Sequence, residues 1–347
     1  MSPEFGLRLG LTLALGTAGG AVFSALRLPL PWMLGAMTFT LFAALLRLPV
    51  VRARMLRSPF AAIVGVAIGS AFNAAALAQG TGLLLLAAAT LVSVLLLSAV
   101  GFLYLSRIAG FDRTTAYFAG VPGGVYEMVH QGGLAGGDER RIALTQATRI
   151  FLVVMLVPFI VRLAVGEVDQ YMRVVPAFSD YRAGDLLLLA ACCLGWPLAA
   201  LLRLPNAAVL GPLLASAVVH AFGLVELPPP PLLVAAAQVV LGASIGGGFL
   251  GTPPRHILVN LGHGILLFSG SIAMVTGLAG LVAAATGLDF MTVLLSLAPG
   301  GMVEMSLIAL VVSADVGVVT VLHLARIVLI HAGAPLAFRR FRPERAE

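Results

Sequence analysis

The amino-acid sequence predicts an all-α polytopic membrane protein built from two repeats that cross the bilayer in opposite directions. Three observations support this prediction: an apolar composition, motifs that recur at a nearly constant offset, and arginines that occur in different loops in the two halves. The chain is 60% hydrophobic and only 10% charged. A soluble domain usually carries about 25% charged residues, so this chain has too few to cover a surface that faces water.

Long uncharged runs give the first part of the prediction. Residues 82–106 and 256–288 contain no aspartate, glutamate, lysine or arginine. Uncharged apolar runs of about 18 or more residues are typical of membrane-spanning helices. The first apolar segment is expected to be a helix of this kind rather than a cleavable signal. The expected spanning segments lie near residues 6–26, 30–47, 59–79, 82–106, 142–164, 184–202, 206–224, 231–250, 256–286 and 317–338.

An internal repeat relates the two halves of the chain. RLPLPWMLG at 27–35 matches RLPNAAVLG at 203–211, and PGGVYEM at 122–128 matches PGGMVEM at 299–305. The offset is 176 residues for the first pair and 177 for the second. Composition alone does not place rare charged residues in one register, so the chain is predicted to be duplicated, with repeat 1 at 1–170 and repeat 2 at 171–347. The residues that match in this register include Asp112 with Asp289, Asp138 with Asp315, and Pro158 with Pro335.

Loop charges predict that the repeats have opposite orientations. Arginines gather after the second segment of the first half, at Arg47, Arg52, Arg54 and Arg57, whereas the matching loop at 224–231 has none. Positively charged loops are typical of the cytoplasmic side. Five crossings per half, with a PGG element that enters and returns, would invert the second repeat and leave both termini and the arginine-rich tail in the cytoplasm. Six crossings per half would make the repeats parallel, which the loop charges disfavour.

The PGG elements are the first candidate site. Proline and glycine interrupt a helix, and a helix that begins inside the membrane leaves its first N–H groups unpaired. Lipid cannot satisfy such groups, so they must face protein, water or a ligand. Paired broken helices are also a recurring feature of secondary transporters. A kinked helix satisfied by neighbouring side chains is the alternative. The residues are Pro122, Gly123, Gly124, Pro299, Gly300 and Gly301.

Two glutamates follow the PGG motifs at matched positions, Glu127 and Glu304. A carboxylate in the first turn of a helix is favoured by the helix dipole, so local capping is one interpretation. An acidic group at the membrane centre nevertheless costs about 2.5–3.5 kcal/mol on insertion scales. Keeping two of them predicts that they bind a cation, carry a proton or hydrogen-bond to a substrate, and capping is compatible with each of these roles.

Two arginines, Arg149 and Arg326, lie inside the last helix of each half. Each is expected to meet a carboxylate or a broken helix end elsewhere, with the glutamate of the opposite repeat as one candidate. The role would be to bind an anion or to form a structural ion pair. One turn earlier lie Gln146 and His323, and His323 is a possible proton relay or a hydrogen-bonded structural residue. On weaker grounds, the cavity that these residues would form is expected to include Asn73, Tyr126 and His130.

Other features predict no further site. The arginine clusters adjoin apolar segments, which favours contact with the lipid bilayer over nucleic acid. Cys192 and Cys193 are adjacent and have no metal-ligand spacing, so we expect packing roles and no metal. No cofactor is expected beyond a coupling ion, H⁺ or Na⁺. The expected partners are the bilayer and a small-molecule solute, with a homo-oligomer left open.

Taken together, the duplicated PGG and RLP motifs resemble those of the AbrB-type membrane protein family, and the resemblance covers nearly the whole chain. It implies a multi-pass protein of the bacterial inner (plasma) membrane. Family members carry several labels, namely transporter, regulator of gene expression and ammonia monooxygenase, so the resemblance implies no particular solute. The second repeat has Ala207 and Ala208 where the first has Pro31 and Trp32, so the two halves need not contribute equally to a site.

Three functions follow from these features. The leading hypothesis is an ion-coupled secondary transporter of a small solute, with an anion as one candidate class and the site at the repeat interface. The second is a membrane sensor that affects gene expression indirectly. The third, a membrane monooxygenase, is disfavoured because the six histidines are scattered singly and metal sites of that kind need clustered ligands. We therefore expect no enzymatic activity.

Overall fold

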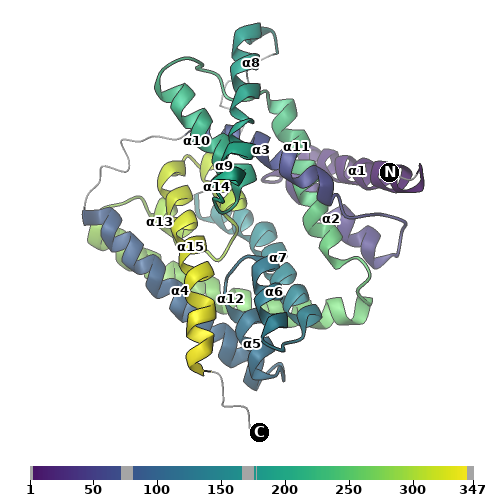
Figure 1. Cartoon of the computed structure of the whole chain (residues 1–347), viewed down its shortest axis with the longest axis vertical. Coiled ribbons are helices and arrows are strands. Elements are labelled where there is room, and N and C mark those ends of the chain that lie inside the picture. The colour runs from purple at the N-terminus through teal and green to yellow at the C-terminus, as the bar shows by residue number, and fades with distance from the viewer. Residues whose placement is uncertain (1–2, 72–80, 166–175, 177, 342–347) are drawn as a thin grey trace. The chain divides into compact units, whose positions relative to one another are not determined.

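The computed structural model describes residues 3–71, 81–165, 176 and 178–341, and all regular structure within them is helical (Figure 1). The all-α prediction is confirmed. The helices of the first half are α1 (Pro3–Ala25), α2 (Pro31–Leu45), α3 (Arg54–Ser70), α4 (Thr81–Arg107), α5 (Arg113–Gly120), α6 (Val125–Leu134) and α7 (Glu139–Val165). Those of the second half are α8 (Ala183–Cys192), α9 (Gly195–Leu201), α10 (Ala207–Ala221), α11 (Pro231–Gly246), α12 (Pro254–Thr286), α13 (Phe290–Leu297), α14 (Met302–Val311) and α15 (Val316–Phe341).

The helices confirm a polytopic membrane protein. Within the described part of the chain, seven spans are long and apolar enough to cross a bilayer, and shorter apolar helices include α2, α10 and most of α3. Each expected crossing segment overlaps one of these helices. The third segment was expected to reach residue 79, but Asn73 and the end of that segment lie outside the described residues. The orientation of the helices in the membrane stays a prediction.

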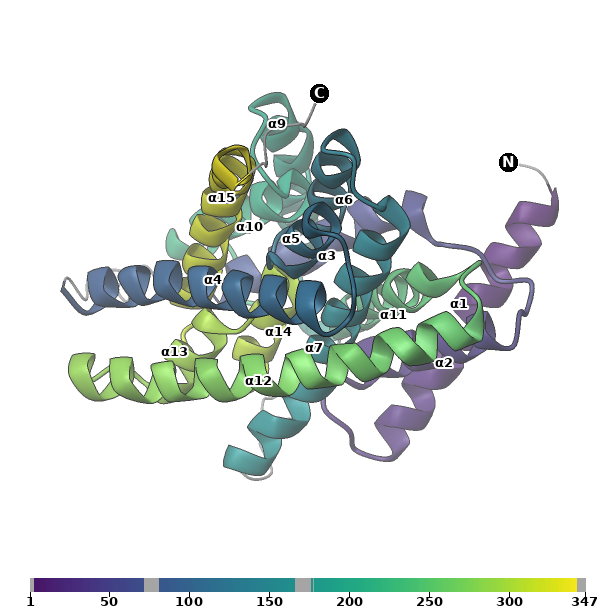
Figure 2. The ribbon, with the colours of Figure 1, turned by 90° about the horizontal axis from the view of Figure 1, so that it is seen from below.

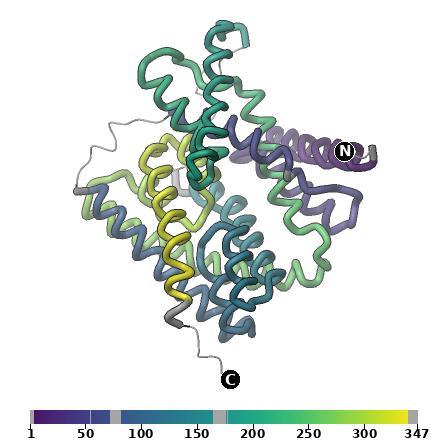
Figure 3. Tube along the Cα trace, viewed as in Figure 1, coloured from purple at the N-terminus to yellow at the C-terminus, as the bar shows by residue number. Residues whose placement is uncertain are grey.

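The internal repeat extends to helix bounds and backbone conformation. Both α2 and α10 have 15 residues, both α5 and α13 have eight, and both α6 and α14 have ten. Left-handed backbone also recurs at matched positions, at Arg27 and Arg203 and at Leu30 and Asn206. One departure is that α1 is continuous whereas its counterpart is divided into α8 and α9. The colours of the trace in Figure 3 let the two halves be followed in chain order.

The chain divides into two compact units, and each contains helices from both halves. Unit 1 comprises residues 1–78, 154–255 and 303–317, and unit 2 comprises residues 79–153, 256–302 and 318–347. Each repeat therefore contributes to both units.

Unit 1 is held together by close helix crossings between the two halves. In this unit α3 packs against α10, and α11 packs against α2. Both α3 and α11 carry a G-x-x-x-G motif, at 65–69 and 242–246. A Cβ atom at the first glycine of α3 would lie 2.4 Å from the backbone oxygen of Val209, and one at the first glycine of α11 would lie 2.2 Å from that of Met33. Only glycine allows backbones to approach so closely.

Unit 2 places the PGG motifs among long helices. Buried side chains from α4, α5, α6, α7 and α15 form one apolar cluster. The hydroxyl of Tyr117 in α5 donates to the backbone oxygen of Ala334 in α15 at 2.8 Å. A hydrogen bond of 2.9 Å joins the hydroxyl of Tyr104 in α4 to Nδ1 of His263 in α12, and Figure 2 shows these two helices running alongside each other. These contacts fix the walls of the candidate site.

Candidate functional site

The predicted breaks are present at both PGG motifs. In the first, α5 ends at Gly120, Val121 is extended with φ −65° and ψ 128°, and α6 begins at Val125. In the second, α13 ends at Leu297 and is followed by extended backbone. Neither half of a broken element spans a membrane alone, because a crossing needs about 20 helical residues. No side chain caps the start of α6 at Gly124.

Arg149 binds the end of the first broken helix. Its Nη1 donates to the backbone oxygen of Val121 at 3.0 Å, and its Nη2 donates to that of Gly123 at 2.9 Å. Gln146 adds bonds from Nε2 to the backbone oxygens of Phe118, at 2.8 Å, and Val121, at 2.9 Å. The last carbonyls of a helix have no partner within it and carry partial negative charge, so α7 caps α5 with a cation and an amide.

Arg326 does the same at the second break. Its guanidinium donates to the backbone oxygens of Ala298 and Gly300, which match Val121 and Gly123 at the repeat offset. Arg326 is only 4% exposed. Of the two expected partners, a carboxylate or a broken helix end, each arginine contacts the helix end. That helix belongs to the same repeat as the arginine.

A cavity of about 50 Å³ in unit 2 receives both breaks, since Pro122 and Pro299 both line it. Arg149 lines it as well. One water molecule needs roughly 10–15 Å³ of such space, so the cavity holds a few waters or a small ion. The other lining residues are Leu97, Gly101, Leu105, Ala119, Gly120, Thr145, Thr148, Asn260, His263, Gly264, Leu267, Phe268 and Ser271.

Helix α12 gives the cavity a polar stripe that was not predicted. Asn260, His263 and Ser271 lie at intervals of three and eight residues, so they share one face of the helix. Nδ2 of Asn260 donates to Oγ1 of Thr148 at 2.8 Å, and Oγ1 of Thr145 donates to Oδ1 of Asn260 at 3.4 Å. Residues 256–288 were predicted to be a purely apolar helix because they contain no charged residue. The spacing of Asn260, His263 and Ser271 was the feature of the sequence that could have predicted the polar face.

Within the described residues, the positive charge at the breaks lacks a neutralising carboxylate. Among the described residues, no carboxylate forms an ion pair with Arg149 or Arg326. The two guanidinium groups repel each other, and Nε of Arg149 is buried without a hydrogen bond. Charges interact more strongly in surroundings of low dielectric constant, so the cavity favours a negatively charged occupant.

Neither glutamate lines this cavity. The carboxylate of Glu127 accepts a 2.8 Å hydrogen bond from Nε2 of Gln131 and lies 3.2 Å from Nε2 of His331. Glu304 is 9% exposed and belongs to unit 1, where the charge of Arg57 acts on it. The two carboxylates therefore belong to different units, and their proposed role in ion coupling stays a prediction.

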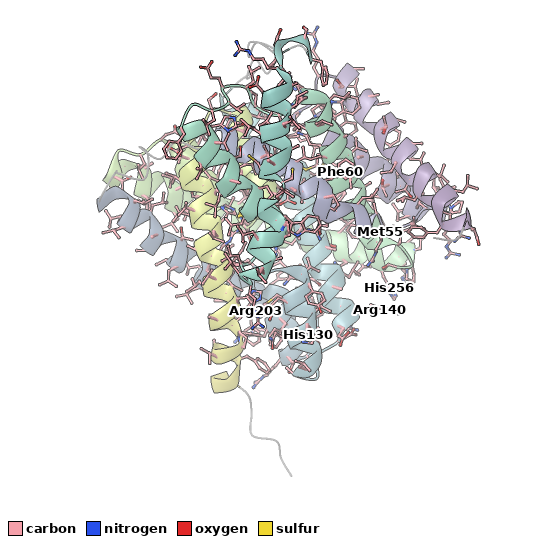
Figure 4. The ribbon with its side chains drawn as sticks, turned by 45° about the horizontal axis from the view of Figure 1, so that its top comes forward. Met55, Phe60, His130, Arg140, Arg203 and His256 are labelled. Atoms are coloured by element: carbon pink, nitrogen blue, oxygen red, sulfur yellow. The ribbon has the colours of Figure 1, made fainter. Side chains whose placement is uncertain are left out.

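The weaker candidates on α6 face away from the cavity. Tyr126 is 79% exposed, and its ring stacks on that of His130 with centroids 6.1 Å apart. His130, labelled in Figure 4, is also exposed. Neither residue lines the cavity. Asp138 instead caps the start of α7 by accepting hydrogen bonds from the backbone N–H groups of Arg140 and Arg141.

Replacing Asn260 by alanine is expected to lower the free energy of unfolding by about 1–2 kcal/mol, because a hydrogen bond between buried groups is lost. Unfolding in detergent with increasing denaturant measures this change. His256→Ala is the matched control, since His256 is exposed on the same helix (Figure 4). Equal effects of the two substitutions would contradict a structured polar face on α12.

No group of three histidine, cysteine, aspartate or glutamate side chains is placed to hold a metal ion in the described parts of the chain. The predicted absence of a metal stays a prediction.

Comparison with known proteins places these features in a family. The family model described as "AbrB: Transition state regulatory protein AbrB" matches residues 32–342. "Putative regulator AbrB" of Escherichia coli (strain K12) is 28% identical, with 96% of this chain and 94% of that protein covered. "Uncharacterized protein YhjN" of Bacillus subtilis (strain 168) is 25% identical, with 94% of this chain and 91% of that protein covered.

Proposed function

This chain belongs to the AbrB family, and from that premise we propose that it is an ion-coupled secondary transporter of a small anionic solute. The observation that carries the proposal is the cavity at the two breaks. Both PGG prolines and Arg149 line it, and no carboxylate among the described residues pairs with Arg149 or Arg326. Broken membrane helices that meet at one cavity are the usual construction of a transporter site.

The size and chemistry of the cavity narrow the class of solute. A volume of about 50 Å³ is well below the roughly 300–1,000 Å³ of sites for drug-sized ligands. Hydroxyl and amide groups from Thr145, Thr148 and Asn260 supply hydrogen bonds beside the arginine. A compact monoanion such as nitrate, formate or acetate fits this combination of charge and size.

The source of energy is proposed to be an ion gradient. The sequence contains no lysine and therefore no P-loop of the kind that binds ATP phosphates. A proton or a sodium ion would then drive accumulation. We propose a location in the bacterial inner membrane with both termini in the cytoplasm, as the loop arginines favour.

Flux into proteoliposomes tests the proposal. Vesicles with the purified protein are expected to take up at least one of nitrate, formate, acetate or chloride in a saturable manner, and faster than protein-free vesicles. A gradient of pH or sodium should change the rate. Absence of protein-dependent flux for all four anions, at every pH tested, would contradict the proposed function.

The names of the relatives favour a second candidate, a membrane sensor that influences gene expression. The family description and one relative both carry the word regulator. A sensor would bind the solute in the same cavity without moving it. Deletion of the gene would then change transcription in the presence of the solute, while uptake by the cells stayed the same. None of these names describes an enzyme, and we propose no enzymatic activity.

A further inference from the structure

The two breaks are capped unequally, and the difference lies at one pair of matched residues. At the first break, Gln146 donates to the backbone oxygens of Phe118 and Val121. The matched residue at the second break is His323, and the oxygens that match are those of Leu295 and Ala298. His323 does not cap them. Its Nδ1 lies 2.9 Å from the backbone oxygen of Val319 on its own helix.

This contact decides which nitrogen carries the hydrogen in the neutral ring. A carbonyl oxygen only accepts, so Nδ1 must be the donor and Nε2 must carry the free lone pair. Nε2 is buried and has no hydrogen-bond partner among the residues that the structure describes, and the side chain is 0% exposed. A buried polar atom without a partner is uncommon in proteins. Here it is a base placed one helical turn from Arg326.

We propose that Nε2 of His323 is the proton-binding site of the transporter, so that the coupling ion is H⁺. The inference rests on the proposed function and names its driving ion. On protonation Nε2 accepts a proton from a hydronium ion, which becomes water, and Nε2 becomes an N–H donor. It can then bond the end of α13, as Gln146 bonds the end of α5, and return the proton to water when the cap opens.

The surrounding charges link this proton to an anion. Arg326 is the charged side chain that acts on His323, and Arg149 in turn repels Arg326. Helix α13 contains no titratable side chain. Glu127 is paired with His331, which lies about 12 Å further along α15 at 1.5 Å per residue. A second positive charge is therefore opposed until an anion enters, and by linkage proton binding and anion binding favour each other.

Hydrogen exchange of the two breaks tests this inference. It is followed by mass spectrometry between pH 5 and 8, in detergent with excess sodium nitrate as the anion, and is corrected for the intrinsic rate. Peptides that cover residues 295–304 are expected to exchange roughly tenfold more slowly at the acidic end, as one charge-assisted hydrogen bond would produce. Peptides that cover residues 118–127 should change little. In His323→Gln the second break should be protected at every pH.

The reciprocal variant is the control. Gln146→His should give the first break a pH dependence that the wild-type protein lacks. That result would show that the effect is due to the histidine rather than to one region of the fold. Unchanged pH dependence of the second break in His323→Gln would overturn the inference. Proteoliposome flux separates this outcome from failure of the proposed function. If proton-driven anion uptake persists in His323→Gln, the proton-binding site is another residue. If the wild-type protein shows no uptake, the proposed transport function is wrong.

Discussion

Replacing Arg149 by glutamine is expected to reduce anion flux at least about 100-fold. The guanidinium supplies positive charge to the cavity and holds the backbone oxygens of Val121 and Gly123. Hydrogen bonds of charged groups contribute about 1.5–3 kcal/mol each, and a difference of 1.4 kcal/mol is tenfold in an equilibrium constant. Glutamine keeps a donor but loses the charge and one of the two bonds. Initial rates of nitrate, formate and acetate uptake into proteoliposomes measure the loss.

Two further variants separate charge from general damage. Arg141→Gln removes an arginine from the same helix, but one whose side chain is 53% exposed, so flux should stay within about twofold, as expected for exposed ion pairs that contribute little. Arg149→Lys keeps the charge without the two-pronged geometry, and its flux should fall between those of the wild-type protein and Arg149→Gln. Normal flux in a folded Arg149→Gln protein would remove this arginine from the mechanism.

Enlarging Gly65 is expected to cause a large loss of stability. A Cβ atom there would lie 2.4 Å from the backbone oxygen of Val209, which cannot move without separating α3 from α10. Overpacking of this kind costs about 1–3 kcal/mol for a small group and more for a large one. Gly65→Ala should lower the midpoint of thermal unfolding in detergent, and Gly65→Leu should prevent recovery of monodisperse protein.

The repeat supplies a second test of the same packing. Gly242 occupies the matched position, and a Cβ atom added there would lie 2.2 Å from the backbone oxygen of Met33. Gly242→Ala should therefore destabilise the protein to a similar degree. Gly10→Ala is the control, because no atom lies within 4 Å of a Cβ built at Gly10 on α1 and alanine favours a helix by about 1 kcal/mol over glycine. Comparable midpoints for all three variants would contradict the close crossings.

The sequence predicted the helices and the breaks well, for a physical reason. In a bilayer each backbone group must find its partner within a helix or in the protein, so apolar runs became helices. The PGG motifs at 122–124 and 299–301 interrupted them. Duplication strengthened the signal, because the bounds of α2, α5 and α6 recur in α10, α13 and α14. The glycine pairs at 65–69 and 242–246 also match at the repeat offset.

The site was predicted only in part, since partners depend on which helices meet. The sequence pointed to Arg149 and the breaks, and the structure supplies their contacts with Val121 and Gly123. The polar face of α12 was not predicted, because single polar residues such as Asn260 do not interrupt an apolar run. The carboxylate of Glu127 looked like part of the same cavity, yet it is held by Gln131 and His331 outside the cavity lining.

Crystals soaked in bromide show whether Pro122, Arg149 and Pro299 surround one anion, as we propose. Bromide is a compact anion that anomalous X-ray scattering locates without knowledge of the natural solute. We expect a peak in the cavity between these three residues, and its loss in crystals of Arg149→Gln. Bromide bound only at exposed arginines, with none in the cavity of the wild-type protein, would contradict the account.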